Sequence, residues 1–243
     1  MCVVVGVYAT PSHSLTYSNK HHVRTQSVKT AKIETPLRTL NNSELDLNEK
    51  AFTHYQTYLQ SDFLEDVNDS SAYEAIREYI TQHHNDIRDK DAEEISKEIV
   101  EQGRLYQIDP KFAAAVISAE SGFNKEAISK SGAKGLGQLM DSTYADFGIQ
   151  NPYNIQENVR GTVLYLKDLI SLWNGHSLQL SLAITSYLRG PVLVKKAEGK
   201  FSDHTLQYLG LILKKYNTLC AIESKIQKKH TNESDKDAVT SLN

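Results

Sequence analysis

Glu120 is the side chain whose position in the sequence most suggests chemistry. It ends an apolar run that extends from Phe112 to Ala119, where a carboxylate is costly to bury unless it has a function or a partner. Desolvation raises the pKa of such a carboxyl, and an acid that stays protonated near neutral pH can donate its proton to a leaving oxygen. Glutamates at helix ends are commonly solvated or ion-paired, so the cost of burial alone leaves the role open.

A glycine-rich segment follows Glu120. It contains Ala127-Ile128-Ser129 and then, at 132–140, the run Gly-Ala-Lys-Gly-Leu-Gly-Gln-Leu-Met. Glycine lets a backbone approach a ligand closely, and the amide of Gln138 can donate to and accept from the amides and hydroxyls of a sugar. A purely structural turn is the alternative. A phosphate-binding loop is excluded because no strand precedes the segment and no Gly-Lys-Ser/Thr follows it.

The elements that position these residues are predicted to be helices. Asp109 and Pro110 indicate the start of the apolar helix, with aspartate as its cap and proline in its first turn. Asp141 or Ser142 is expected to cap a short helix, and further helices are expected at about 177–188 and 202–219. Between them, a long amphipathic helix is indicated by apolar residues at steps of three and four, namely Val159, Val163, Leu166, Ile170 and Trp173. The fold class is therefore mainly α, with at most a short hairpin.

Composition divides the chain into four parts. Residues 1–42 consist of a short apolar run at 2–9 followed by a polar stretch. We interpret them as a candidate export signal and linker, with a buried strand as the alternative for 2–9. Residues 43–103 are a helical lead-in segment that Gly103 is expected to end. Residues 104–221 are the main domain, and residues 222–243 a polar, solvated tail. Within the lead-in, helices are expected at about 70–84 and 90–103, after a first helix that Ser43 caps and that carries Leu45, Leu47, Phe52, Tyr55 and Leu59.

Composition and charge exclude several functions. Hydrophobic residues make up 40% of the chain and charged residues 23%, as in a soluble globular protein. The net charge of -3, with lysine and glutamate interspersed, argues against nucleic-acid binding. The two cysteines, Cys2 and Cys220, say little about redox compartment, and the adjacent histidine pairs at 21–22 and 83–84 lack metal-ligand spacing. No metal or other cofactor is therefore expected.

Five blocks of the sequence resemble the catalytic domain of soluble lytic transglycosylases, which are lysozyme-like and related to goose-type lysozyme. The first two are Glu120-Ser121 and the pattern Ser-x-x-Gly-Ala-x-Gly-Leu-x-Gln-Leu-Met-x-x-Thr at 129–143. The others are residues 151–155, 182–191 and 205–208, and all five occur in the family's order over about 104–219. The resemblance implies a lysozyme-like helical catalytic domain, preceded by a small helical segment, that cuts the glycan strands of peptidoglycan.

By this resemblance, Glu120 is the catalytic acid/base, and Tyr187 hydrogen-bonds it and holds it in position. The implied substrate-binding residues are Ser129, Gln138, Met140, Tyr187 and Tyr208. Judged without the family, Tyr187 would be a helix-packing aromatic and Met140 a core filler.

The chain departs from the family pattern at three places. Gly137 stands where the family usually has Met, which removes a hydrophobic wall, and Asp141 stands where it usually has Pro. Leu188 and Arg189 replace the Asn and Ala that usually follow Tyr187. The loss of that Asn affects the expected substrate contacts, while Glu120 and Tyr187 are retained.

The reaction depends on whether Glu120 has a carboxylate partner, because most glycosidases use two carboxylates. Goose-type lysozymes carry an Asp where this chain has Met140. The family's single-carboxylate mechanism then applies: Glu120 protonates the bond between N-acetylmuramic acid (MurNAc) and N-acetylglucosamine (GlcNAc), and the same MurNAc closes a 1,6-anhydro ring. Two alternatives are a muramidase that activates water with Asp141 or Asp146, and a catalytically weak peptidoglycan-binding module.

Peptidoglycan glycan strands are therefore the expected partner, with no nucleic acid. Because the wall lies outside the cytoplasm, the expected location is the periplasm or cell envelope. Residues 43–103 could also dock to a partner in the cell-envelope machinery, but neither such a partner nor an oligomeric state is indicated by any motif in the chain.

Overall fold

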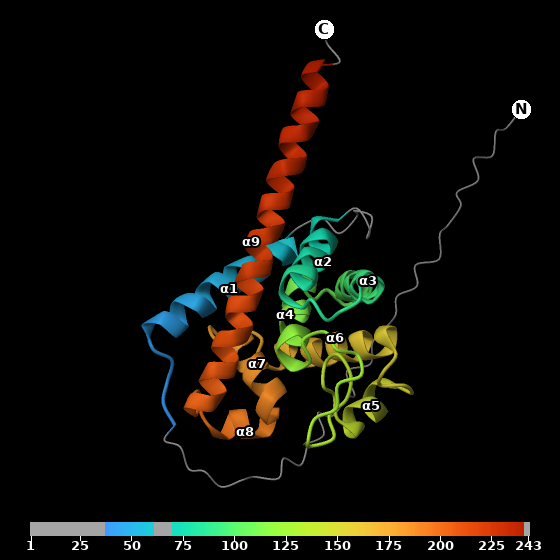
Figure 1. Cartoon of the computed structure of the whole chain (residues 1–243). Helices are drawn as coiled ribbons and strands as arrows, with labels where there is room; N and C mark the ends of the chain where they lie inside the picture. Colours follow the sequence, from blue (N-terminus) through green and yellow to red (C-terminus); the bar gives the residue numbers. More distant parts are fainter. Residues whose placement is uncertain (1–36, 61–69, 241–243) are drawn as a thin grey trace, which may run out of the picture.

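The computed structural model describes residues 37–60 and 70–240, with side chains placed as far as residue 232 (Figure 1). Most of these residues lie in helices, and the only β pairings among them are isolated bridges in two places, so the mainly α prediction is confirmed. The helices are α1 (Asn42–Gln60), α2 (Ser71–His83), α3 (Asp89–Tyr106), α4 (Pro110–Glu120), α5 (Asp141–Phe147), α6 (Ile155–Leu172), α7 (Gln179–Arg189), α8 (Pro191–Lys196) and α9 (Asp203–Thr240).

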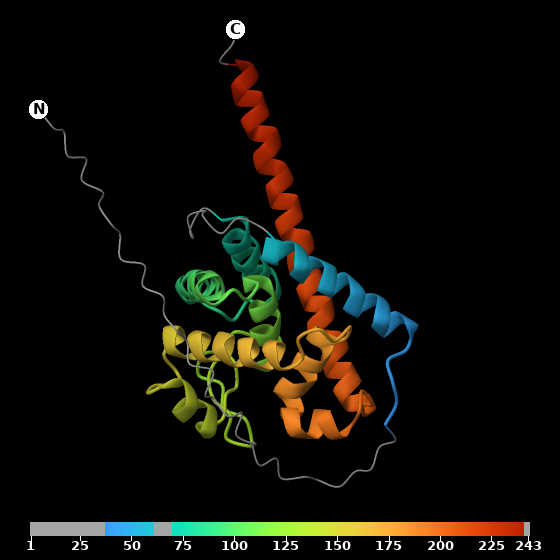
Figure 2. The same cartoon turned by 180° about the vertical axis from the view of Figure 1, so that it is seen from behind.

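Helix α4 lies at the centre of the fold and packs against α2, α3, α6 and α9. All of its residues from Pro110 to Ser118 are buried, as the apolar run predicts. The predicted cap is confirmed, because Asp109 Oδ1 accepts the Lys111 amide proton at 2.9 Å. Seen from behind, α6 runs across the body beneath α3 and α4 (Figure 2). Its predicted apolar stripe faces the core: Val159, Val163 and Leu166 are fully buried.

A buried group of charges ties the first turn of α4 to the middle of α9. Lys111, 5% exposed, places its Nζ 3.0 Å from Asp109 Oδ1 and 3.1 Å from Glu223 Oε2. The Tyr216 hydroxyl donates to Asp109 Oδ2 at 2.5 Å. Burial alone would lower the pKa of Lys111, but the two carboxylates outweigh it and raise the pKa, so the ammonium stays charged.

The predicted boundary at residue 103 does not separate two structural units. Helix α3 crosses it, and α1, α2 and α3 share one hydrophobic core with the later helices. Gly103 does not end α3: a side chain there would lie 2.7 Å from the Ile108 carbonyl oxygen and 2.9 Å from Pro110 Cγ. The glycine instead lets the chain turn back tightly from α3 into α4.

The predicted boundary at residue 222 also falls inside a helix. Helix α9 continues from Asp203 to Thr240, and at its middle Ile222 is buried in the core while Glu223 pairs with Lys111. The polar tail therefore begins as part of the packed helix. Beyond this contact α9 projects from the body of the molecule (Figure 1).

Two predicted helix caps are wrong. Helix α1 is capped by Asn41, whose Oδ1 accepts from the Glu44 amide at 3.0 Å while Glu44 reaches back to the Asn41 amide at 2.8 Å. This reciprocal pair excludes Ser43 from the capping position. Helix α5 begins at Asp141 after Met140, with no side-chain cap. Within α1, Leu45 and Leu59 are exposed, whereas Tyr55 is buried.

Residues 1–36 lie outside the described residues, and with them the candidate export signal and Cys2. The other cysteine, Cys220, is buried in the core. In the part of the chain that the structure describes, no helix combines the length and apolar character needed to cross a membrane.

Replacing Lys111 with methionine should destabilise the fold strongly, because it leaves Asp109 and Glu223 as buried carboxylates without a counter-charge. The expected cost is about 3–5 kcal/mol in the free energy of unfolding, measured by denaturant titration. Lys214→Met, at an exposed position of the same helix α9, is the matched control and should change stability little. Equal stability of the two variants would show that the ion group does not hold α4 to α9.

Candidate active site

Glu120 is the last residue of α4, and its carboxyl meets a tyrosine from α9. The hydroxyl of Tyr208 donates a hydrogen bond to Glu120 Oε1. Because α4 is fixed by burial along most of its length and α9 packs along it, the two side chains are held on rigid elements rather than on loops. The side chain predicted as the acid/base therefore lies at a junction of helices.

The environment of Glu120 raises its pKa from 4.5 to about 7. Desolvation by burial is the larger cause and disfavours the carboxylate, whereas the Tyr208 hydrogen bond favours the carboxylate and lowers the pKa. The balance leaves the group able to exist in both protonation states near neutral pH. That is the condition for a residue that must first give and then take a proton.

Tyr187 does not make the predicted hydrogen bond to Glu120. Its hydroxyl donates to the carbonyl oxygen of Gly137 at 2.6 Å, so it holds the glycine-rich loop rather than the acid. Tyr187 is buried near Glu120 nonetheless: burial raises the pKa of its hydroxyl well above 10, and the charge of Glu120 adds to this. The sequence analysis expected Tyr187 to donate the hydrogen bond to Glu120. Tyr208, from the fifth block of the resemblance, donates it instead.

The peptide around Gly137 is held from both sides. Its N–H donates to Asn158 Oδ1 at 2.8 Å, and its carbonyl accepts from Tyr187. A side chain at 137 would overlap Thr162 Oγ1 and approach the Tyr187 hydroxyl to 3.0 Å. The space that the family's usual methionine at position 137 would need is therefore occupied here by Thr162 of α6.

Asn158 is a site residue that the sequence analysis missed. It is 1% exposed, and besides holding Gly137 it donates through Nδ2 to the Pro152 carbonyl at 2.8 Å. A side chain at Gly135 would overlap this same amide, and Gly135 has a φ of 73°. Asn158 therefore explains why the loop needs glycine here. A polar residue within the apolar stripe of α6 was the available signal.

The other predicted substrate-binding residues lie in or beside the loop. Gln138 uses both Nε2 hydrogens within the loop, donating to the carbonyls of Ala127 at 3.1 Å and Gly135 at 3.0 Å. Ser129 Oγ accepts the Ala133 amide at 3.0 Å, and Met140 precedes α5 half-buried. Ser129 and Gln138 thus shape the loop, and within the described residues neither side chain forms a hydrogen bond with Glu120.

No second carboxylate acts on Glu120 within the described residues, where desolvation and Tyr208 account for its pKa shift. Asp141 is paired with Lys134 at 3.0 Å and its side chain is 78% exposed, and Asp146 is exposed on α5. Nor does the described part of the chain contain a cluster of three metal-binding side chains. The arrangement is a single half-buried acid with a phenol donor.

A comparison with known protein families matches the part of the chain that contains this site. The family model of the transglycosylase SLT domain matches residues 98–209, a range that includes Glu120, Gln138, Tyr187 and Tyr208. This part of the chain is therefore similar to the transglycosylase SLT domain family. The SLT domain extends from the second half of α3 into the start of α9, so it takes in residues that the sequence analysis assigned to the lead-in.

Two relatives illustrate the similarity. A transglycosylase of Enterobacteria phage PRD1 is 28% identical over 114 residues, which are 47% of this chain and 40% of the phage protein. The X-ray structure of an inactive mutant of the lytic transglycosylase Slt from Pseudomonas aeruginosa has 20% sequence identity and a TM-score of 0.46, covering 76% of this chain and 30% of that one. The chain thus spans less than half the length of either relative.

Gly137→Ala should disrupt the SLT domain's loop, because the added methyl group overlaps Thr162 and crowds the Tyr187 hydroxyl. We expect a loss of about 1–3 kcal/mol in stability and reduced activity. Adding Thr162→Ala, which removes the overlapping hydroxyl, should recover part of both losses in a double-mutant cycle. Gly210→Ala is the control, since nothing lies within 4 Å of a methyl group there. Additive losses would argue that residues 137 and 162 are not packed as described.

Proposed function

We propose that this chain is a peptidoglycan lytic transglycosylase. In this proposal it cleaves the β-1,4 bond between MurNAc and GlcNAc and leaves 1,6-anhydro-MurNAc ends, with Glu120 as its catalytic acid and base. The observation that carries the proposal is a half-buried carboxyl whose pKa is raised to about 7 and on which no second carboxylate of the described chain acts. The match of residues 98–209 to the transglycosylase SLT domain supports the same reaction class.

The first half of the reaction uses the protonated form of Glu120. The carboxyl donates its proton to the bridging oxygen, the bond to the MurNAc anomeric carbon breaks, and GlcNAc leaves with a free hydroxyl. The muramyl acetamide stabilises the positive anomeric carbon. Glu120 is then a carboxylate, and the Tyr208 hydroxyl that donates to it stabilises this form.

The second half uses the carboxylate as a base. Glu120 takes the proton from the 6-hydroxyl of the same MurNAc, and the 6-oxygen bonds to the anomeric carbon to close the anhydro ring. The acid is thereby regenerated and no water is consumed. A carboxyl with a pKa near 7 suits both steps, because neither protonation state is strongly disfavoured at neutral pH.

The main alternative is hydrolysis, which requires a carboxylate that activates water at about 6.5–9.5 Å from the acid, or a nucleophile at about 5 Å. Asp141 and Asp146 are exposed on α5, and Asp141 is engaged by Lys134. We therefore favour the intramolecular nucleophile. The substrate places the proposed site of action in the periplasm or cell envelope.

Glu120→Gln should abolish cleavage of purified sacculi, because the amide can neither donate the proton nor accept it later. The expected fall in rate is at least about 100-fold. Wild-type protein should release muropeptides with 1,6-anhydro ends, identified by mass spectrometry, and Asp141→Asn should behave like wild type. Reducing MurNAc ends in place of anhydro ends would establish a muramidase. Binding without turnover by the wild type would establish a non-catalytic module.

The rate should depend on pH through Glu120. Because the protonated form starts the reaction and its pKa is about 7, kcat/KM should fall about tenfold per unit at pH values well above 7. Tyr208→Phe removes a hydrogen bond that favours the carboxylate, so the falling limb should move to higher pH. Tyr153→Phe is the control, because Tyr153 lies before α6 and forms no hydrogen bond with Glu120, and it should leave the limb unchanged. A falling limb of kcat/KM near pH 4.5, or a limb that does not move in Tyr208→Phe, would refute Glu120 as the acid.

A further inference from the structure

One histidine contacts the chain both before and after Glu120. The Nε2 atom of His84 lies 3.1 Å from the hydroxyl oxygen of Ser118, which precedes Glu120 by two residues on α4. The same imidazole packs edge-to-face on the ring of Phe123, with centroids 5.1 Å apart, and a side chain at Gly122 would lie 3.3 Å from its Nδ1. His84 follows α2 as its C-cap, so the contact comes from outside the region that matches the SLT domain.

The turn that follows Glu120 depends on this packing. Gly122 and Phe123 have φ values of 60° and 63°, in the left-handed region that a bulky side chain rarely adopts. Phe123 is 1% exposed, and the rings of His84 and Tyr79 both pair edge-to-face with its ring. Such a backbone conformation persists only where the surrounding contacts fix it. His84 therefore helps to determine how the chain leaves Glu120.

A lysine of α9 binds the same hydroxyl as His84. The Lys215 ammonium donates to Ser118 Oγ at 2.9 Å and to the Tyr79 hydroxyl oxygen at 3.3 Å. Because an ammonium group can only donate, the proton of Ser118 is left for His84 Nε2. Ser118 is 6% exposed, so these two partners satisfy a buried hydroxyl in the last turn of α4. Side chains of α4 and α9 and the C-cap of α2 are thus joined at one atom.

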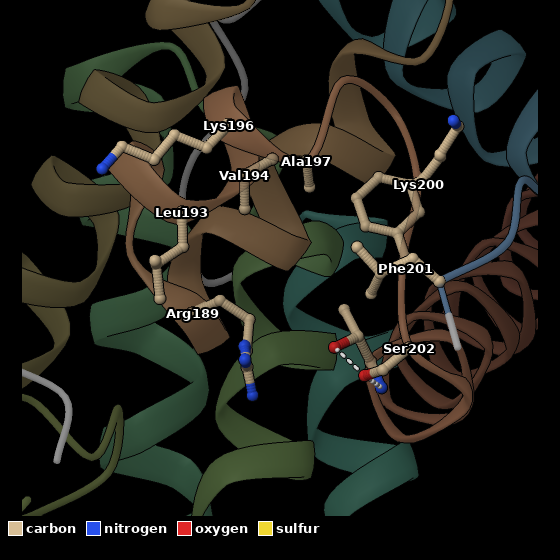
Figure 3. Close-up of a pocket in the computed structure, with 10 residues that line it drawn as sticks. Arg189, Leu193, Val194, Lys196, Ala197, Lys200, Phe201 and Ser202 are labelled. Carbon is tan, nitrogen blue, oxygen red and sulfur yellow. Dashed lines mark hydrogen bonds between the residues drawn. The ribbon is translucent and has the colours of Figure 1, made fainter. Parts of the chain in front are cut away.

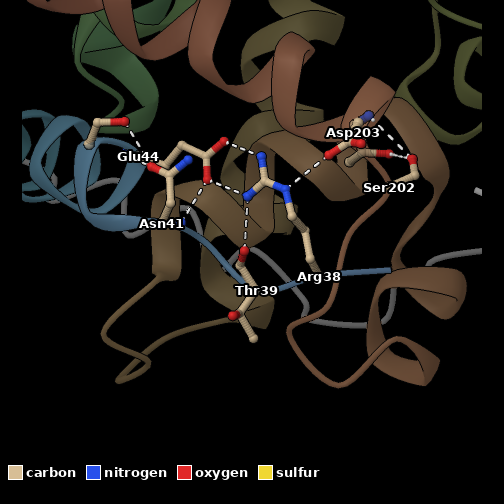
Figure 4. A network of polar contacts seen from close by, with 8 residues as sticks. Arg38, Thr39, Asn41, Glu44, Ser202 and Asp203 are labelled. Carbon is tan, nitrogen blue, oxygen red and sulfur yellow. Dashed lines mark hydrogen bonds and ion pairs between the residues drawn. The ribbon is translucent and has the colours of Figure 1, made fainter. Parts of the chain in front are cut away.

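The start of α9 is tied down on one side and open on another. Arg38 pairs with Asp203 at 2.9 Å and with Glu44 at 2.8 Å, which links the first residue of α9 to α1 (Figure 4). A pocket of about 240 Å³, which Thr205 helps to line, lies beside the same turn (Figure 3). Tyr208 follows Thr205 by about one helical turn. The position of Tyr208 therefore also depends on the contacts that α9 makes further along.

We propose that His84, Ser118 and Lys215 form a positioning network for the catalytic acid. By fixing the end of α4 against α9, the network keeps Glu120 aligned with the Tyr208 hydroxyl that donates to it. The network requires a neutral imidazole, because a protonated His84 cannot accept from Ser118 and would place a second positive charge beside Lys215. The inference rests on the proposed function, since the three side chains act only through the position of Glu120.

The surroundings of His84 favour its neutral form. Burial lowers the pKa of His84 below its usual 6.5, and the nearby Lys215 ammonium lowers it further. Asp86, in the segment that follows α2, opposes this shift, whereas His83 adds to it. Tyr79, whose ring centroid lies 6.1 Å from that of His84, is a further titratable neighbour. The network is therefore intact near neutral pH and is lost when His84 takes up a proton in acid.

The first test compares turnover of sacculi by two His84 variants. His84→Phe keeps a ring against Phe123 but cannot accept from Ser118, so kcat should fall at least about tenfold with little change in KM. His84→Gln supplies an amide oxygen as acceptor and should recover most of the rate. His83→Phe, at the exposed neighbour that stacks on Tyr79, is the matched control and should behave like wild type. A wild-type rate in His84→Phe, or a loss that His84→Gln does not recover, overturns the inference.

The pH profile distinguishes this network from a contact that only stabilises the fold. In wild type, kcat/KM should fall below pH 6.5 as His84 becomes protonated, in addition to the fall above pH 7 that Glu120 causes. His84→Gln has no titratable group at this position, so it should lose the acid limb and keep the alkaline limb. A wild-type profile without an acid limb, or an unchanged acid limb in His84→Gln, overturns the inference.

A last measurement needs no turnover. In ¹⁵N-labelled protein, the imidazole resonances of His84 should show a proton on Nδ1 at neutral pH and a titration midpoint below 6.5. Ser118→Ala removes the hydrogen bond that favours the neutral ring, so this midpoint should rise. A proton on Nε2, or a midpoint that Ser118→Ala does not move, overturns the inference. The predicted His84 titration in a wild-type protein that leaves sacculi uncut would instead refute the proposed function.

Discussion

Two opposing effects on the pKa of Glu120 are the constraint on which the rest of the structure depends. Burial at the end of α4 disfavours the charged carboxylate, and a hydrogen bond from Tyr208 favours it, with burial prevailing and the pKa near 7. A carboxyl whose pKa is raised by folding makes the folded state less stable as the pH rises from 4.5, its pKa in the unfolded chain, to about 7. In this range the native state keeps a proton that the unfolded state has released. The fold therefore contains a group that lowers its stability at neutral pH, and the rest of the molecule must hold that group in place.

Two sets of contacts that extend beyond the SLT region provide that support. The buried pairing of Lys111 with Asp109 and Glu223 ties α4 to the part of α9 beyond the matched residues. Helices α1 and α2 pack against α9 and share its core. The position of Tyr208 relative to Glu120 is thus set by elements from nearly the whole described chain, which is why the lead-in helices and the SLT region fold as one unit.

Local sequence signals predicted where the helices lie better than they predicted the contacts between side chains of different helices. The Asp109-Pro110 start of α4, the apolar stripe of α6 and the place of Glu120 depend on spacing along one helix, and they are confirmed. Which tyrosine reaches Glu120 depends on how α7 and α9 pack. The resemblance assigned this contact to Tyr187 and only substrate binding to Tyr208, whereas the structure gives the contact to Tyr208. The close contact of Gly137 with Thr162, and the role of Asn158, likewise arise between segments more than 20 residues apart. The boundaries at 103 and 222 were misplaced because glycine and polar composition were interpreted as breaks.

The most direct test of this account is the pKa of Glu120 itself, measured from the chemical shift of its ¹³C-labelled side-chain carboxyl across a pH titration, with Glu120→Gln used to assign the signal. The account predicts a midpoint near 7. A midpoint near 4.5, the value of a solvated glutamate, would contradict it, because the carboxyl would then be ionised at neutral pH and unable to begin the cleavage.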